Sequence, residues 1–107
     1  MKEDNNIILA DLKILLSQKY QKELKNVILF GSQLSGKATK NSDYDILIIL
    51  KQRPDWKKER EISDLCYEIE LKYGIITDTH ILSEDDLTNH RGKQPIFVNE
   101  LSNGLFA

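Results

Sequence analysis

Two carboxylates stand at the head of one apolar strand. Asp43 and Asp45 directly precede the run Ile46 to Leu50. Strand side chains repeat every two residues, so both acids point to one face, about 6.6 Å apart along the backbone. Charged groups at the head of a buried strand are costly unless they bind a cation or another charge. At this spacing both can coordinate one metal ion, or a pair about 3.5–4 Å apart, as phosphoryl-transfer sites require.

Gly31 and Ser32 form the second part of a candidate nucleotide site. They follow the short apolar run Val27 to Phe30, and backbone N–H groups of such a tight turn can receive phosphate oxygens. The turn lies at the C-terminal end of its strand, whereas the acids lie at the N-terminal end of theirs. The two can be neighbours only if the strands run antiparallel, with residues 31–42 as the connection. The sequence therefore predicts an antiparallel strand pair.

A P-loop is the main structural alternative. The run from Gly31 to Lys37 satisfies G-x-x-x-x-G-K after an apolar strand, but Ala38 stands where a Ser or Thr hydroxyl would bind magnesium. A P-loop also needs a parallel sheet, with its second acidic residue at the end of an apolar strand. Here the acids come at the beginning of the strand, which favours the antiparallel arrangement.

The motif spacing resembles the G-S-x10-D-x-D signature of the minimal nucleotidyltransferases, the small members of the DNA polymerase β-like superfamily. Gly31-Ser32, ten intervening residues and Asp43-Tyr44-Asp45 carry the resemblance. A third acid, Asp78, lies in a later apolar stretch, and residues 99–105 resemble the family's C-terminal helix and glycine. The resemblance covers nearly the whole chain.

The resemblance implies a metal-dependent enzyme that moves a nucleoside monophosphate, typically AMP from ATP, onto a hydroxyl. Asp43 and Asp45 would hold two Mg²⁺ or Mn²⁺ ions, with Asp78 on one of them, and carboxylate oxygens suit magnesium. Gly31 and Ser32 would hold the β- and γ-phosphates that leave as pyrophosphate. The resemblance also implies a partner, because small family members are typically paired with a HEPN-domain protein as toxin and antitoxin, and adenylylate a tyrosine of the toxin.

Asp78 has two interpretations. Its strand face also carries Ile76, His80 and Leu82, so we expect at least partly buried surroundings. In the first interpretation the acid lies at a wet strand edge or pairs with a lysine. In the second, which the resemblance implies, it completes the acidic triad and accepts the proton of the attacking hydroxyl, and a nearby cation keeps it ionised.

The connection between the two motifs leaves further alternatives open. Lys37 and Lys40 could neutralise a triphosphate, or either could be a solvated loop lysine. Gln33 and Ser35 stand where many family members carry arginines just after the Gly-Ser pair. That departure favours a non-catalytic subunit that inhibits its partner by contact alone, whereas retention of all three acids favours an enzyme.

Length and composition predict a single domain over residues 1–107. The chain is 40% hydrophobic and 30% charged, with a net charge of −2, so it can bury one modest core. This charge argues against a generic nucleic-acid binder, which is usually strongly basic. No apolar run approaches the about 20 residues that span a membrane, and the N-terminus does not resemble a signal peptide. A single cysteine, Cys66, permits no internal disulfide, which is compatible with a cytoplasmic location.

Hydrophobic periodicity predicts the elements that must position these residues. The fold class is α/β (α+β), with a small mixed sheet, an antiparallel first strand pair and flanking helices. Gly74 is expected to end the long central helix, and a capping box to start the short one that follows. The expected elements are a helix over about 4–21, strands Val27–Phe30, Asp43–Leu50 and Ile75–Leu82, a helix Asp55–Tyr73, a short helix from Ser83 and a helical segment from Pro95 to about Gly104.

Overall fold

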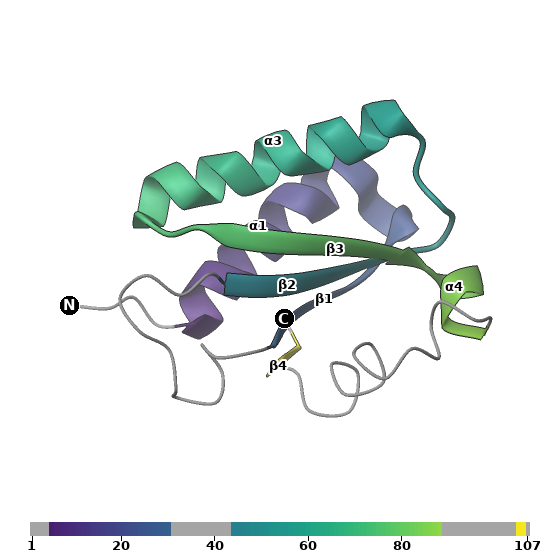
Figure 1. Ribbon diagram of the computed structural model, residues 1–107, viewed down its shortest axis with the longest axis horizontal. Helices are drawn as coiled ribbons and strands as arrows, with labels where there is room; N and C mark the ends of the chain where they lie inside the picture. The colour runs from purple at the N-terminus through teal and green to yellow at the C-terminus, as the bar shows by residue number, and fades with distance from the viewer. Residues whose placement is uncertain (1–4, 31–43, 89–104, 107) are drawn as a thin grey trace.

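The computed structural model describes residues 5–30, 44–88 and 105–106, and its elements form a mixed α/β domain (Figure 1). In chain order they are α1 (Asn5–Tyr20), the 3-10 turn η1 (Gln21–Glu23), β1 (Leu24–Phe30), β2 (Tyr44–Leu50), α3 (Trp56–Tyr73), β3 (Thr77–Ser83), α4 (Glu84–Thr88) and β4 (Leu105–Phe106). The predicted fold class is confirmed.

The strands form one mixed sheet with the order β3-β2-β1-β4. β1 and β2 pair antiparallel, as the position of the two motifs requires, while β2 and β3 pair parallel. Parallel neighbours need a long crossover connection, and α3 supplies it. Among the described strands β2 is therefore central, and its apolar run is buried on both faces of the sheet.

Helices α1 and α3 cover one face of the sheet (Figure 1). The main core lies between them and the sheet, because alternate β2 residues such as Ile46 and Ile48 belong to the same buried cluster as Leu12, Leu16 and residues of α3. The smaller cluster on the opposite face consists of Ile28, Leu47, Ile49 and Leu82. We call the first face the covered face and the second, over which neither α1 nor α3 lies (Figure 1), the open face; the four side chains of its cluster are also buried.

The ends of α3 follow from its sequence. The Asp55 carboxylate accepts a hydrogen bond from the backbone N–H of Lys58 at 2.8 Å, as an N-cap does. At the other end Gly74 has a left-handed φ of 64°, which glycine adopts without steric cost. The backbone N–H groups of Gly74 and Ile75 both donate to the carbonyl of Glu70, and they satisfy a carbonyl that the helix leaves unpaired. The predicted start and stop are confirmed.

Several expected boundaries shift in the structure. β1 begins at Leu24 rather than Val27, because Leu24 and Asn26 extend the ladder across a bulge. β3 begins at Thr77 rather than Ile75 and continues to Ser83. β4 was not expected; its two residues pair antiparallel with Ile28 and Leu29 of β1. The helical segment expected from Pro95 lies outside the described residues.

Candidate functional site

Asp45 and Asp78 lie side by side in the sheet. They are register partners in the parallel pairing of β2 with β3, and neighbouring strands are about 4.8 Å apart. Register partners place their side chains on the same face, so the two carboxylates that the sequence analysis singled out from distant segments come from adjacent positions. Both residues lie near the N-terminal ends of their strands.

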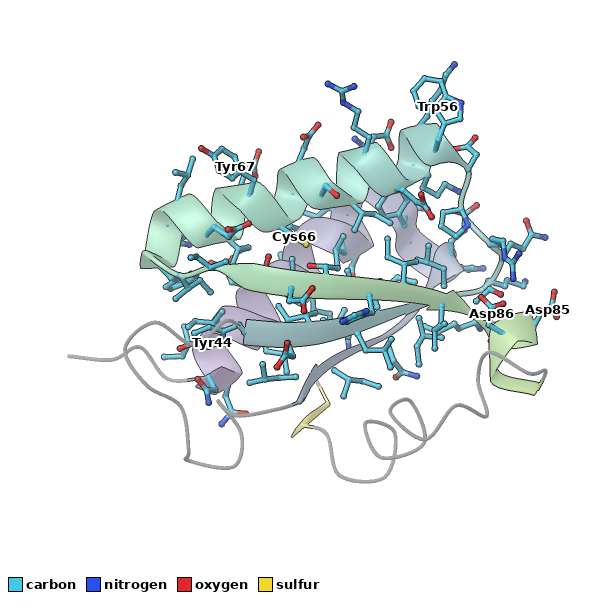
Figure 2. The ribbon with its side chains drawn as sticks, in the orientation of Figure 1. Tyr44, Trp56, Cys66, Tyr67, Asp85 and Asp86 are labelled. Carbon is cyan, nitrogen blue, oxygen red and sulfur yellow. The ribbon has the colours of Figure 1, made fainter. Side chains whose placement is uncertain are left out.

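The face that carries these acids is the open one. Tyr44 and Ile46, on either side of Asp45, belong to the main core cluster beneath the helices. Leu47 and Ile49, at the alternate positions, belong to the cluster on the opposite face. Because strand side chains alternate, Asp45 shares the open face with Leu47. Tyr44 is buried at the start of β2 (Figure 2), and this burial raises the pKa of its phenol.

The surroundings of the two acids differ. Asp45 is half-buried on the central strand, whereas the Asp78 side chain is 55% exposed on β3, at an edge of the sheet. Ile76, directly before β3, is 58% exposed. The expectation of partly buried surroundings for Asp78 is therefore wrong for this neighbour, whereas His80 is half-buried and Leu82 is buried, as expected. Asp78 therefore lies at a solvent-exposed edge of the sheet, as in the first interpretation, and it also lies next to Asp45, as the second interpretation requires.

His80 lies beside Asp78, on the strand face where the sequence analysis placed it. Its Nε2 atom lies 3.7 Å from Oδ2 of Asp78, and its side chain is 34% exposed. The two residues are two positions apart, which places both side chains on one strand face.

The remaining predicted site residues lie outside the described residues. They are Gly31, Ser32, Lys37, Lys40 and Asp43. Their neighbours along the chain are described: Phe30, which precedes the Gly-Ser pair, is the register partner of Asp45. The end of β1 and the acidic start of β2 are therefore adjacent, as the antiparallel prediction required.

The P-loop alternative is wrong. Both described neighbours of β1 in the sheet, β2 and β4, run antiparallel to it. A P-loop strand belongs to a parallel sheet, and residues 31–43 instead join two antiparallel neighbours.

The described residues contain two of the three carboxylates that we predict to bind metal. Across residues 5–30, 44–88 and 105–106, no three His, Cys, Asp or Glu side chains come together as a metal cluster. Asp45 and Asp78 contribute two carboxylates to one face, and carboxylate oxygens are the ligands that Mg²⁺ prefers. Asp43, by strand alternation, is predicted to add a third from the residue before Tyr44.

A buried carboxylate in α4 has a structural role. Asp86 is 1% exposed, accepts from the Ser83 backbone N–H at 2.9 Å, and lies 2.5 Å from Nη2 of Arg53. The Ser83 hydroxyl in turn accepts from the Asp86 N–H, so the predicted capping box is confirmed. Burial alone would raise the pKa of Asp86, but the bonds from Ser83 and Arg53 outweigh it and lower the pKa to about 2.

Comparisons with known proteins show which family this chain belongs to. Residues 11–102 match the sequence model of the family described as polymerase beta, nucleotidyltransferase. Two proteins of Methanocaldococcus jannaschii, each named "putative protein adenylyltransferase", are similar to this chain. One is 35% identical over 83% of this chain and 83% of its own length, and the other is 30% identical over 90% of each.

Solved structures show the same fold. A crystal structure of a toxin-antitoxin with AMP-PNP has a TM-score of 0.55 and 20% identity, and the match covers 89% of this chain and 68% of that one. A mutant of the toxin-antitoxin MntA-HpeT has a TM-score of 0.57 and 18% identity, covering 97% of this chain and 72% of that one.

Within the described part of this chain, no helix is both long and apolar enough to cross a membrane.

Proposed function

The chain belongs to the polymerase β-like nucleotidyltransferase family, and we propose that it transfers AMP from ATP to a hydroxyl of a partner protein. The observation that carries this proposal is the register pairing of Asp45 with Asp78 on the open face, beside the end of β1. The names of the two archaeal relatives support a protein acceptor. The single buried cysteine, Cys66, fits the proposed cytoplasmic location.

The acids of the open face fit divalent metal ions. Asp45 and Asp78 offer hard oxygen ligands from adjacent strands, and Asp43 would add a third. We propose that these residues hold two Mg²⁺ or Mn²⁺ ions, with Asp78 on one of them. When bound, the metal ions would offset the charge that develops on the α-phosphoryl oxygens.

Other residues of the chain would bind the phosphates and accept the proton of the acceptor hydroxyl. Gly31 and Ser32 would hold the β- and γ-phosphates through backbone N–H groups and a hydroxyl, and Lys37 or Lys40 would neutralise their charge. The acceptor's hydroxyl oxygen bonds to the α-phosphorus as the bond to pyrophosphate breaks. Asp78 would accept the hydroxyl proton, and its exposed position on the edge strand leaves room for an acceptor.

We propose a HEPN-domain toxin as the acceptor, modified on a tyrosine, with this chain as the antitoxin. Two observations support a toxin-antitoxin role. The family resemblance implies such a partner, and solved structures with the same fold are described as toxin-antitoxin complexes. The whole unit, residues 1–107, would act as one domain.

The test is a transfer assay with α-labelled ATP, Mg²⁺ and the protein encoded beside this one. Wild type is expected to leave one or more AMP units on that protein, detected by retained label and by intact mass. Asp43→Asn should abolish transfer, because it removes a metal ligand with little change of size. Asp85→Asn, on the exposed surface of α4, is the matched control and should retain full activity.

A non-catalytic binding subunit is the second candidate. Gln33 and Ser35, in place of the family's frequent arginines, favour it. A wild-type protein that binds its partner tightly, yet transfers nothing from any nucleotide with Mg²⁺ or Mn²⁺, would establish this candidate and refute the enzyme.

A further inference from the structure

Large apolar side chains lie along the outer side of α3. Trp56, Tyr67 and Leu71 are 69%, 57% and 67% exposed. At 3.6 residues per turn, positions 56, 67 and 71 fall on one side of the helix. Figure 2 shows Trp56 and Tyr67 directed away from the sheet. Single exposed apolar residues are ordinary, but three in a stripe indicate a surface that another protein covers. We call this stripe, with the charged residues beside it, the α3 outer face.

The charges of the α3 outer face are separated along the helix. Lys57 and Arg60 lie in its N-terminal half, and Asp64 and Glu68 lie in its C-terminal half; all four are exposed. Lys57 lies 5.7 Å from the centre of the Trp56 ring. Among the described residues no salt bridge involves Arg60, Asp64 or Glu68. Because the basic and acidic residues are separated along the helix, this face can pair with a second copy that runs in the opposite direction.

We propose that the α3 outer face is a homodimer interface, in which the α3 helices of two copies pack antiparallel about a twofold axis. In an isologous interface, residue i contacts j and j contacts i. One axis between Ser63 and Asp64 places Trp56 against Leu71 of the second copy. The same axis places Arg60 against Tyr67 of the second copy, where a guanidinium can stack on the ring.

The twofold axis also satisfies the charges. Lys57 falls within one helical turn of Glu68 of the second copy, and Arg60 within one turn of Asp64. Ser63, a small exposed residue at the centre, lets the helices approach closely. A parallel pairing would set basic residues against basic and acidic against acidic. Opposite charges across the interface therefore select the antiparallel arrangement.

The size of the helix limits how tight this dimer can be. α3 has 18 residues, which corresponds to a length of about 27 Å. An interface built mainly on one helix pair falls at the low end of specific protein contacts, so we expect a dissociation constant in the micromolar range, about 1–100 μM. The α3 outer face points away from the open face of the sheet (Figure 1), so dimerisation leaves the candidate site accessible and is independent of the proposed reaction.

The first experiment measures the mass of the full chain by analytical ultracentrifugation as concentration rises through that range. Wild type is expected to change from monomer to dimer. Trp56 is the only tryptophan, so its emission should shift to the blue over the same range as the ring becomes buried. Leu71→Asp should remain monomeric throughout. Ile76→Asp, at an exposed isoleucine outside α3, is the matched control and should dimerise as wild type does.

The second experiment tests the pairing by exchanging charges. Arg60→Asp should weaken the dimer at least tenfold by setting acids against acids. Adding Asp64→Arg to the same chain should recover most of the lost affinity, because residues 60 and 64 of the two copies are again opposite in sign. Circular dichroism of each variant checks that α3 remains folded. A wild-type chain that is monomeric at every concentration would overturn the proposal. So would a double variant that fails to recover, or a Trp56 shift that appears only when the co-encoded protein is added.

Discussion

The covered and open faces of the sheet use alternate residues of the same strands for different purposes. On the covered face, alternate β2 side chains enter a core that also draws on α1, α3 and β1. On the open face, the described apolar cluster has four members, and two acids continue it toward the N-terminal ends of β2 and β3. The contrast shows how one strand can hold the fold together with one set of positions and, in the proposed function, carry chemistry with the other.

The separation is sharpest at the start of β2. Tyr44 is buried among the core residues, whereas Asp45, one position later, is half-buried on the opposite face. Because neighbouring strand residues point to opposite faces, substitutions one position apart should affect different properties. The predictions below test that separation, from the largest expected effect to the smallest.

Replacing Asp45 with asparagine should remove activity but leave the domain folded. We expect the rate of AMP transfer to fall by about a thousandfold, which corresponds to about 4 kcal/mol, because a metal ligand is lost. The free energy of unfolding should change by less than about 1 kcal/mol, since the side chain keeps its volume and lies outside the main core. Transfer assays and urea titrations measure the two quantities. An active variant, or an unfolded one, would contradict the assignment of Asp45 to chemistry.

Ile48 and Ile49 allow the two faces to be compared with one substitution. Both are fully buried on β2, but Ile48 belongs to the covered-face cluster and Ile49 to the open-face cluster. The cost of a cavity depends on how well the surroundings collapse. We expect Ile48→Ala to lower the free energy of unfolding by about 4 kcal/mol and Ile49→Ala by about 2 kcal/mol. Equal losses in urea titrations would show that the open face is packed as tightly as the covered one.

Much of the covered face could be predicted from the sequence, because hydrophobic periodicity and caps are local signals. Asp55 and Gly74 mark the two ends of α3 as expected. The antiparallel pairing of β1 with β2 was also accessible, because only that arrangement brings the Gly-Ser turn to the acids. Leu24 was missed, since the polar Lys25 and Asn26 that follow it hide the start of β1.

The open face was harder to predict, because its neighbours come from distant parts of the chain. The sequence indicated that Asp45 and Asp78 were acids of interest, but their pairing in register depends on the length of α3 and on how β3 docks. Ile76, directly before β3, is likewise more exposed than its apolar side chain suggested. Strand alternation determines on which face of the sheet a side chain lies, but it does not determine how deeply the neighbouring side chains are buried.

Asp86 is a buried carboxylate that we expect to contribute only to the stability of the fold. Its pKa in the folded protein is about 2, below the ordinary 3.8, because bonds from Ser83 and Arg53 outweigh the effect of burial. Its contribution is therefore complete above about pH 4 and is lost as the pH falls toward 2. It amounts to about 2 kcal/mol, which Asp86→Asn should remove at pH 7. The unfolding free energies of wild type and variant, measured from pH 7 to pH 2, should converge at the acid end. A constant difference would assign the loss to packing rather than to charge.

The smallest expected effect is the stabilisation of the open face by metal. A ligand that binds only the folded state stabilises it by about 1.4 kcal/mol at ten times its dissociation constant. Mg²⁺ or Mn²⁺ should therefore raise the melting temperature of wild type. Asp43→Asn/Asp45→Asn should show no such rise, because the ligands on β2 are gone, while Ile49→Ala should keep the full rise because its loss is one of packing. Equal shifts in wild type and the double variant would place the metal elsewhere and would remove the reason for assigning these acids to chemistry.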